Sequence, residues 1–351
     1  MAGKKRIELI DVAKALTIFT VILGHTAGNL DTPTYRIIIY AFHMPLFFIL
    51  AGMSMKVKPV LSWKDGKKFL YKNILAIIVP YFVWGMIFSQ STYDVSIPNL
   101  LYGSWEGLVQ MNTLTSLWFL PCFFVAKLIA QAVISLISAL RIPKVSLACG
   151  ISAVILYIVG MIVPHPEIGC FFCSDAALTA AAFILLGVAL KRSILILAQQ
   201  KNYVLAICLA GSLIMFVIGT FARLDKLGLS LMCNAQYVHP FWFAWNALSG
   251  SMVIMSISMI IERISRESPF PFSVKAITFI GQHTMGIFII HKQFLANLVM
   301  PFLNNYLSGH LPVTVIALIG AVIMLPVSCG ICVIIEKFIP QMLGQFSEPA
   351  S

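Results

Sequence analysis

The feature that most constrains this chain is a succession of apolar runs, each about 20 residues long, which is the length of a helix that crosses a bilayer. In lipid only helices and closed barrels satisfy the backbone hydrogen bonds, and runs this long favour helices. With 60% hydrophobic and 11% charged residues over 351 positions, the chain is too apolar for a soluble domain. The sequence therefore predicts an all-α, polytopic membrane protein. Ten spans are expected at 7–28, 35–55, 69–88, 114–139, 145–163, 176–190, 203–221, 241–261, 277–299 and 313–335.

The loops between these runs orient the chain, because lysine and arginine accumulate in cytoplasmic loops. Most loop cations fall on one side, and the other side carries Arg36, Arg223 and Lys226. An even number of spans then places both termini in the cytoplasm. The net charge of +11 is explained by this topology and by anionic lipid, so nothing calls for a nucleic-acid partner. We expect one membrane domain over residues 1–340 and a short cytoplasmic tail over 341–351.

The first apolar run contains ionisable side chains, which are costly in a bilayer and usually functional. Asp11 and Lys14 interrupt the run, so it is expected to stay in the protein as a first span rather than act as a cleaved signal peptide. His25 follows Lys14 by eleven residues, which brings the two to within roughly 20° on one helix face and separates them by roughly 16 Å. Asp11 lies three residues before Lys14 and is expected to pair with it. A polar track thus runs along one side of the helix.

Histidines from three expected spans fall at a similar depth near the outer face: His25, His43 and His291. Each one alone is more often a buried structural residue, but their convergence favours a site. The pair Cys170 and Cys173 lies in an expected external loop, where a disulfide, a redox role or no role at all are open alternatives. No zinc-ligand spacing occurs, so no metal is expected.

Several stretches resemble the integral-membrane acyltransferase family 3. The most specific is the opening segment 6–14 followed by His25, because a basic residue, ten intervening positions and a histidine recur there in that family. The second is the stretch 42–48, with His43 and Pro45, running to Gly52. Further similar stretches are 67–72 leading to 80–81, 117–120, 183–187 and 281–291, so that the resemblance covers nearly the whole chain.

The resemblance implies a ten-span enzyme that transfers an acyl group, commonly acetyl from acetyl-CoA, to a hydroxyl of a sugar or another envelope molecule. The sequence as a whole is similar to the sugar O-acetylase branch of this family, whose members resemble fucose 4-O-acetylases. It also implies acetyl-CoA as a co-substrate with no permanently bound cofactor, and a bacterial cytoplasmic membrane. Lys14 and Lys72 stand where the family usually has arginine. The donor phosphates would then bind to compact ammonium charges and not to guanidinium groups that can form two parallel hydrogen bonds.

These observations assign expected roles. His25 is the expected general base, because a neutral histidine is suited to take a hydroxyl proton near neutral pH. His43 or His291 would orient it, bind the acceptor or polarise the thioester. Lys14, Lys72, Lys67 and Lys68 are candidates for the donor phosphates, although Lys72 could simply snorkel and Lys67 and Lys68 could only reflect topology. Candidates for the glycan acceptor, with an interfacial aromatic belt as the alternative, are Trp105, Trp118, Gln236, Trp242 and Asn246.

Two other functions stay open at this level. A secondary transporter or flippase could use the same Lys14 and His25 track, although Asp11 is the only carboxylate well inside an expected span and no inverted repeat is visible. A sensor or assembly partner in envelope synthesis is the third reading. The oligomeric state and the acceptor are not specified by the sequence.

Overall fold

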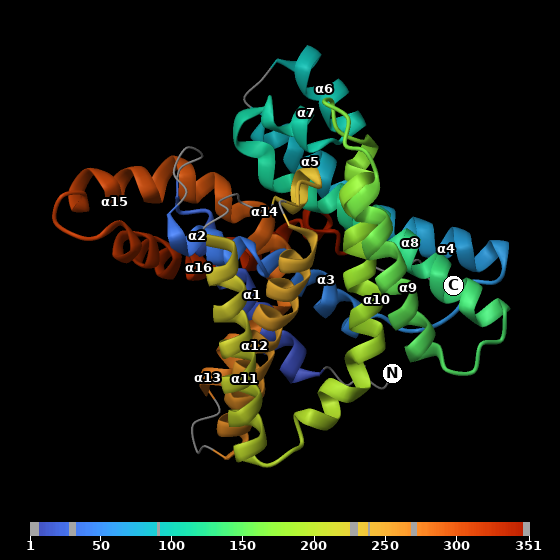
Figure 1. Ribbon diagram of the computed structural model, residues 1–351. Coiled ribbons are helices and arrows are strands. Elements are labelled where there is room, and N and C mark those ends of the chain that lie inside the picture. Colours follow the sequence, from blue (N-terminus) through green and yellow to red (C-terminus); the bar gives the residue numbers. More distant parts are fainter. Residues whose placement is uncertain are drawn as a thin grey trace.

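The computed structural model describes residues 7–27, 33–89, 92–224, 231–237, 239–267 and 272–346, and this part of the chain is almost wholly helical (Figure 1). The only β-type pairings in these residues are two isolated bridges. The helices in chain order are α1 Glu8–Gly24, α2 Thr34–Tyr40, α3 His43–Ser54, α4 Trp63–Asn73, η1 Ile74–Ile78, α5 Val79–Phe88, α6 Tyr93–Tyr102, α7 Trp105–Val109, η2 Asn112–Trp118, α8 Phe119–Ala139, α9 Val145–Ile162, η3 Phe171–Cys173, α10 Ser174–Leu197, α11 Asn202–Leu224, η4 Met232–Asn234, α12 Pro240–Glu267, α13 Phe272–Gln282, α14 Thr284–Phe294, η5 Leu295–Val299, α15 Met300–Leu307, α16 Val313–Phe338 and η6 Pro340–Leu343.

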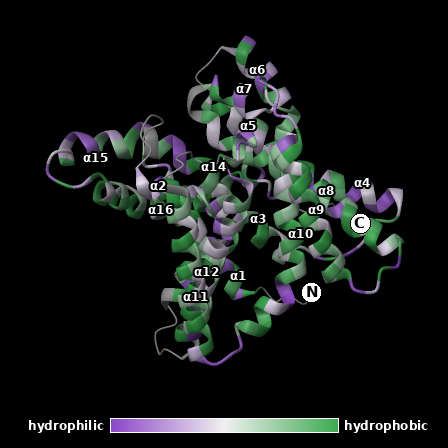
Figure 2. Cartoon of the chain, in the orientation of Figure 1, coloured by the Kyte–Doolittle hydropathy of each residue, from purple (hydrophilic) through white to green (hydrophobic). Residues whose placement is uncertain are grey.

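Nine helical segments in the described residues are long and apolar enough to cross a membrane. They confirm a multi-pass α-helical membrane protein, and hydrophobic residues dominate the long helices in Figure 2. The first expected span, 7–28, forms α1, which has 17 residues. The nine longer segments, which do not include α1, are Thr34–Ser54, Trp63–Phe88, Leu114–Ala139, Val145–Ile162, Phe171–Leu197, Asn202–Ala222, Pro240–Ser265, Thr284–Leu307 and Val313–Phe338.

Two expected spans are not single straight helices. The second is broken at Ala41 and Phe42, so that α2 and α3 are separate helices. The ninth, expected at 277–299, is interrupted at His283, and the long apolar segment runs instead over Thr284–Leu307. His283 Nδ1 lies 2.6 Å from the Phe279 carbonyl oxygen, and its Nε2 lies 2.9 Å from Glu336 of α16. This polar junction holds the break between α13 and α14, and hydropathy alone cannot reveal it.

Helix α1 lies at the centre of the fold, in contact with α2, α3, α12, α13, α14 and α16. Most of its side chains are buried, including Val12, Ala13, Ile18 and Ile22. A helix surrounded in this way presents its polar track to protein and not to lipid. The directions in which Lys14 and His25 point are therefore fixed by the helices packed around α1.

Two π-helical segments adjoin the polar parts of the fold. η1 directly follows Lys72 and Asn73, and η5 begins shortly after Lys292. A π-turn inserts an extra residue into the helix and re-aims the side chains on either side of it, which is why such turns are frequent at functional sites.

Candidate active site

His25 and His291 form a directly bonded pair at the end of α1. His25 is the C-cap residue of α1, and its Nδ1 lies 2.7 Å from His291 Nε2 of α14. The two ring planes differ by 5° and the ring centroids are 5.0 Å apart. Because the centroid separation exceeds the nitrogen–nitrogen distance by roughly the width of one ring, the rings lie edge to edge in a common plane. This is a hydrogen-bonded pair, not a face-to-face stack.

Backbone carbonyls assign the protons of this pair. His291 Nδ1 lies 2.8 Å from the Phe288 oxygen and 3.1 Å from the Ile287 oxygen, and carbonyl oxygens only accept, so His291 Nδ1 carries a proton. In the neutral ring His291 Nε2 is then an acceptor, and His25 Nδ1 must donate to it. It follows that His25 Nε2 holds a lone pair and can accept a proton.

His43 lies near this pair but is not bonded to it. Its Nδ1 donates to the Ile39 carbonyl oxygen at 2.8 Å, and the residue is 3% exposed. The ring of Tyr40 contacts both histidines, with its centroid 4.9 Å from that of His43 and 6.2 Å from that of His25. The buried guanidinium of Arg36 lies 5.1 Å over the Tyr40 ring. Tyr40 is therefore in contact with His25, His43 and Arg36 alike.

A cavity of about 620 Å³ opens beside Lys14, and we call it the donor pocket after the role that the sequence leads us to expect for Lys14. Lys14 and Lys72 line it, and the Lys14 ammonium lies 3.9 Å from the Asp11 carboxylate. Three further lysines line the same pocket, namely Lys56, Lys58 and Lys127. By contrast, Lys67 and Lys68 are exposed on α4 and do not line it.

Lys127 is a pocket cation that the sequence reasoning missed. It belongs to α8, which crosses the membrane, and its ammonium lies 5.3 Å from the centroid of the Phe123 ring. The signal that could have found it is its place inside an apolar run, since an ionisable residue there is a functional candidate by default.

Side chains of α8 also hold the loop that carries Lys56 and Lys58. Gln131 Nε2 donates to the Lys58 carbonyl oxygen at 2.9 Å, and the Val60 amide donates to Ser135 Oγ at 2.9 Å. The loop backbone is thereby tied across the wall of the donor pocket, and Lys56 and Lys58 line the pocket where it opens, with their side chains exposed.

Aromatic rings form the wall between the donor pocket and the histidine pair. Phe119 and Phe288 both line the pocket, with ring centroids 4.9 Å apart. The Phe288 ring centroid is 5.8 Å from that of His291, and the Phe288 carbonyl oxygen accepts the hydrogen bond from His291 Nδ1. The pocket therefore ends one helical turn from the histidine pair.

The residues expected to bind an acceptor do not gather at one place. Trp118 is buried and packs on Phe119, whereas Trp242 belongs to an aromatic group with Trp245 at the start of α12. Asn246 is fully buried against Gly219 of α11, Gln236 is exposed, and Trp105 packs on the core beside Glu106. No hydrogen bond or ring contact joins any two of the five.

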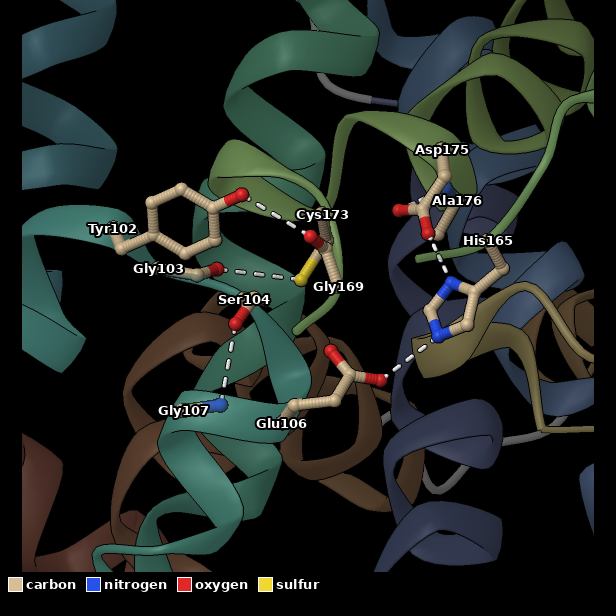
Figure 3. A network of polar contacts seen from close by, with 10 residues as sticks. All are labelled: Tyr102, Gly103, Ser104, Glu106, Gly107, His165, Gly169, Cys173, Asp175 and Ala176. Carbon is tan, nitrogen blue, oxygen red and sulfur yellow. Dashed lines mark hydrogen bonds and ion pairs between the residues drawn. The ribbon is translucent and has the colours of Figure 1, made fainter. Parts of the chain in front are cut away.

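A second polar cluster lies where α7, α9 and α10 meet and consists of Glu106, His165 and Asp175 (Figure 3). His165 Nδ1 is 2.5 Å from Asp175 Oδ2, and its Nε2 is 2.9 Å from Glu106 Oε1. The cluster ties α7, the loop after α9 and the start of α10 together. Beside it Gly169 has φ +72°, and a Cβ there would collide with Glu106 Oε2. Cys170 and Cys173 of the same loop are free thiols, so they form no disulfide here.

This cluster predicts a pH-dependent stability. Burial by itself lowers the pKa of the His165 imidazole, but the Asp175 and Glu106 carboxylates outweigh it and raise the pKa above its ordinary value. The bound proton stabilises the fold below the ordinary pKa of about 6.5, and this contribution is lost as pH rises through the raised pKa. We expect the thermal unfolding midpoint of the protein to exceed that of His165→Gln at acidic pH, and the difference to shrink on alkalinisation. A difference independent of pH would contradict this.

The comparisons with known proteins assign the chain to a family. The family model described as an acyltransferase domain, that of acyltransferase family 3, matches residues 7–336. Searches of the curated proteins and of the solved structures found no match. The match covers nearly the whole chain, so the protein belongs to this family and is a multi-pass membrane acyltransferase.

Proposed function

We propose that the protein transfers an acetyl group from cytoplasmic acetyl-CoA to a hydroxyl of an extracytoplasmic or lipid-linked glycan, with His25 as the general base. The observation that carries this proposal is the arrangement on α1. Its Lys14 lines a cationic pocket, and its His25 ends the same helix with a proton-accepting Nε2. A donor bound in the pocket beside Lys14 can therefore be attacked at its thioester by a hydroxyl that His25 deprotonates.

The donor pocket fits the chemistry of a coenzyme A thioester. Its lysines offer charge-assisted hydrogen bonds to nucleotide phosphates, and its apolar wall of Phe119, Phe123 and Phe288 suits the less polar pantetheine arm. The volume is within the range of small-molecule sites. In this assignment the phosphates bind near Lys72, Lys56 and Lys58, and the thioester lies toward Phe288.

The histidine pair supplies the chemistry. His25 Nε2 takes the proton of the acceptor hydroxyl as its oxygen attacks the thioester carbonyl carbon. The imidazolium that forms is stabilised by His25 Nδ1–H donating to His291 Nε2, and His291 is itself anchored by two backbone carbonyls. His291 thus orients the base and fixes its tautomer, as the third member of a catalytic triad does.

A transfer assay tests the proposal. Purified protein in detergent is mixed with acetyl-CoA labelled in the acetyl group and with the host cell's surface polysaccharide after mild alkaline removal of its esters. We expect label in the polysaccharide and free coenzyme A in equal amounts. Absence of transfer, together with accumulation of a solute in sealed vesicles without acetyl-CoA, would replace the enzyme by a transporter.

Donor affinity should depend on the charge of Lys14 rather than on its shape. Lys14→Arg is expected to bind acetyl-CoA within about threefold of the wild type, whereas Lys14→Ala loses a charge-assisted contact of about 1.5–3 kcal/mol, a loss of roughly tenfold or more. Calorimetry with acetyl-CoA measures this, and Lys68→Ala is the matched control because Lys68 is exposed outside the pocket. Equal affinity of Lys14→Ala and Lys14→Arg would remove Lys14 from the donor site.

A further inference from the structure

Lys292 continues the wall of the donor pocket outward along α14. Met285 and Phe288 line the pocket, and Lys292 follows them at seven and four residues. Seven residues bring a helix back to within roughly 20° of the same face, and four residues rise about 6 Å. The Lys292 side chain therefore projects from the pocket-lining face one turn beyond Phe288. It does so beside His291, which holds the base.

The Lys292 ammonium is held in place but not neutralised. It donates to the hydroxyl of Thr115, which belongs to η2. Among the described residues no carboxylate lies within 4.0 Å of it, and the side chain is only partly accessible. A cation inside a membrane protein is costly unless it meets negative charge. In the part of the chain that the structure describes, Thr115 is its one hydrogen-bond partner, which leaves two N–H groups that a ligand could accept from.

We propose that Lys292 is a catalytic residue that binds the thioester carbonyl oxygen and stabilises the oxyanion formed on it. This inference rests on the proposed acyl transfer and adds the electrophilic half of the site. The cation needs no reorganisation during the reaction, because Thr115 already anchors it.

The reaction conserves bonds and protons. The acceptor oxygen loses its proton to His25 Nε2 and forms a bond to the carbonyl carbon, while the carbonyl π electrons move to oxygen, beside Lys292. When the carbonyl re-forms, the carbon–sulfur bond breaks and the thiolate takes the proton from His25. The products are the O-acyl ester and the free coenzyme A thiol, and both side chains return to their starting state.

The test compares Lys292→Met with Lys292→Arg in the transfer assay. We expect Lys292→Met to lower kcat by about 10²–10³-fold, the usual effect of removing one oxyanion donor, while acetyl-CoA binds by calorimetry within about threefold of the wild type. Lys292→Arg should recover at least about a tenth of the wild-type kcat, because it keeps a cationic donor. Thr115→Val keeps the charge but frees it, and should lower kcat by a smaller factor. Lys275→Met is the matched control, since Lys275 is exposed on α13.

Each outcome decides the inference. A kcat of Lys292→Met within about threefold of the wild type would overturn it while leaving acyl transfer intact. So would a loss confined to acetyl-CoA affinity, which would make Lys292 another phosphate-binding cation. If Lys292→Met does not yield a monodisperse protein, the activities of Lys292→Arg and Thr115→Val test the inference instead. Full activity of Thr115→Val together with no activity of Lys292→Arg would contradict an oxyanion site formed by an anchored cation. A wild type that transfers no acetyl group overturns the proposed function as well.

Discussion

Replacing His25 by alanine is expected to lower kcat for acetyl transfer by about 10²–10⁴-fold, the usual contribution of a positioned general base. Binding of acetyl-CoA should remain near wild type, because the lysines of the donor pocket lie eleven residues before His25 on α1, on other helices and on the loop between α3 and α4. The loss of kcat is expected because His25 Nε2 is the ring nitrogen of the pair that can accept a proton. Backbone carbonyls hold the proton on His291 Nδ1, and His291 Nε2 in turn accepts the hydrogen bond from His25 Nδ1.

The measurement is kcat against KM for both substrates, with calorimetry for the donor. His310→Ala is the control, because His310 is exposed at the turn between α15 and α16. His291→Ala should lower kcat by a smaller factor than His25→Ala, since it removes the group that orients the base but leaves the base in place. The double variant should be little worse than His25→Ala, because the two act as a unit.

The opposite pattern would relocate the base. If His25→Ala kept activity within about tenfold of wild type while His43→Ala abolished it, the proton would be taken by His43 Nε2, which is also left unprotonated by the bond from Nδ1 to Ile39.

The sequence predicts much of the inner geometry of α1 but not the bonding partner of His25. A spacing of eleven residues places Lys14 and His25 on one face by helix geometry alone. Which of His43 and His291 reaches His25 depends on the packing of helices far apart in the chain, and no local pattern encodes it. The same holds for the two carbonyls that fix the His291 proton, because they belong to the backbone.

The lining of the pocket was predicted only in part, for a related reason. Lys14 and Lys72 line the pocket, whereas Lys67 and Lys68 do not, although Lys68 lies one turn before Lys72 on nearly the same face of α4. Charge counting cannot separate a lysine that lines a pocket from one that only reflects topology. For the acceptor side, aromatic and amide residues near the surface were too common a pattern to identify a site.

Packing explains why several of the recognisable sequence stretches contain glycine. Gly52 of α3 and Gly187 of α10 face one another so closely that a Cβ at Gly52 would lie 1.9 Å from the Ile184 oxygen, and one at Gly187 would lie 2.0 Å from the Ile49 oxygen. Small residues allow this backbone contact, which is a main source of helix association in membranes. The glycines of these two stretches thus allow the helices of the scaffold to pack closely.

Substitution of Gly187 by valine is accordingly expected to destabilise the fold by about 3 kcal/mol or more, at or beyond the upper end for overpacking, or to prevent folding. The side chain would meet the rigid backbone of α3 and not a mobile side chain, so the two helices must separate. Because α3 also contacts α1, the separation should disturb the helix that carries Lys14 and His25. Thermal unfolding followed by size-exclusion chromatography measures the effect.

The matched control is Gly330→Val in α16, where nothing lies within 4 Å of the added Cβ. There the substitution should change stability by no more than about 1 kcal/mol, since an open helical glycine is not constrained by its surroundings. A wild-type unfolding midpoint for Gly187→Val would mean that α3 and α10 can move apart at little cost. The backbone contact between them would then not be what fixes the helix bundle around the active site.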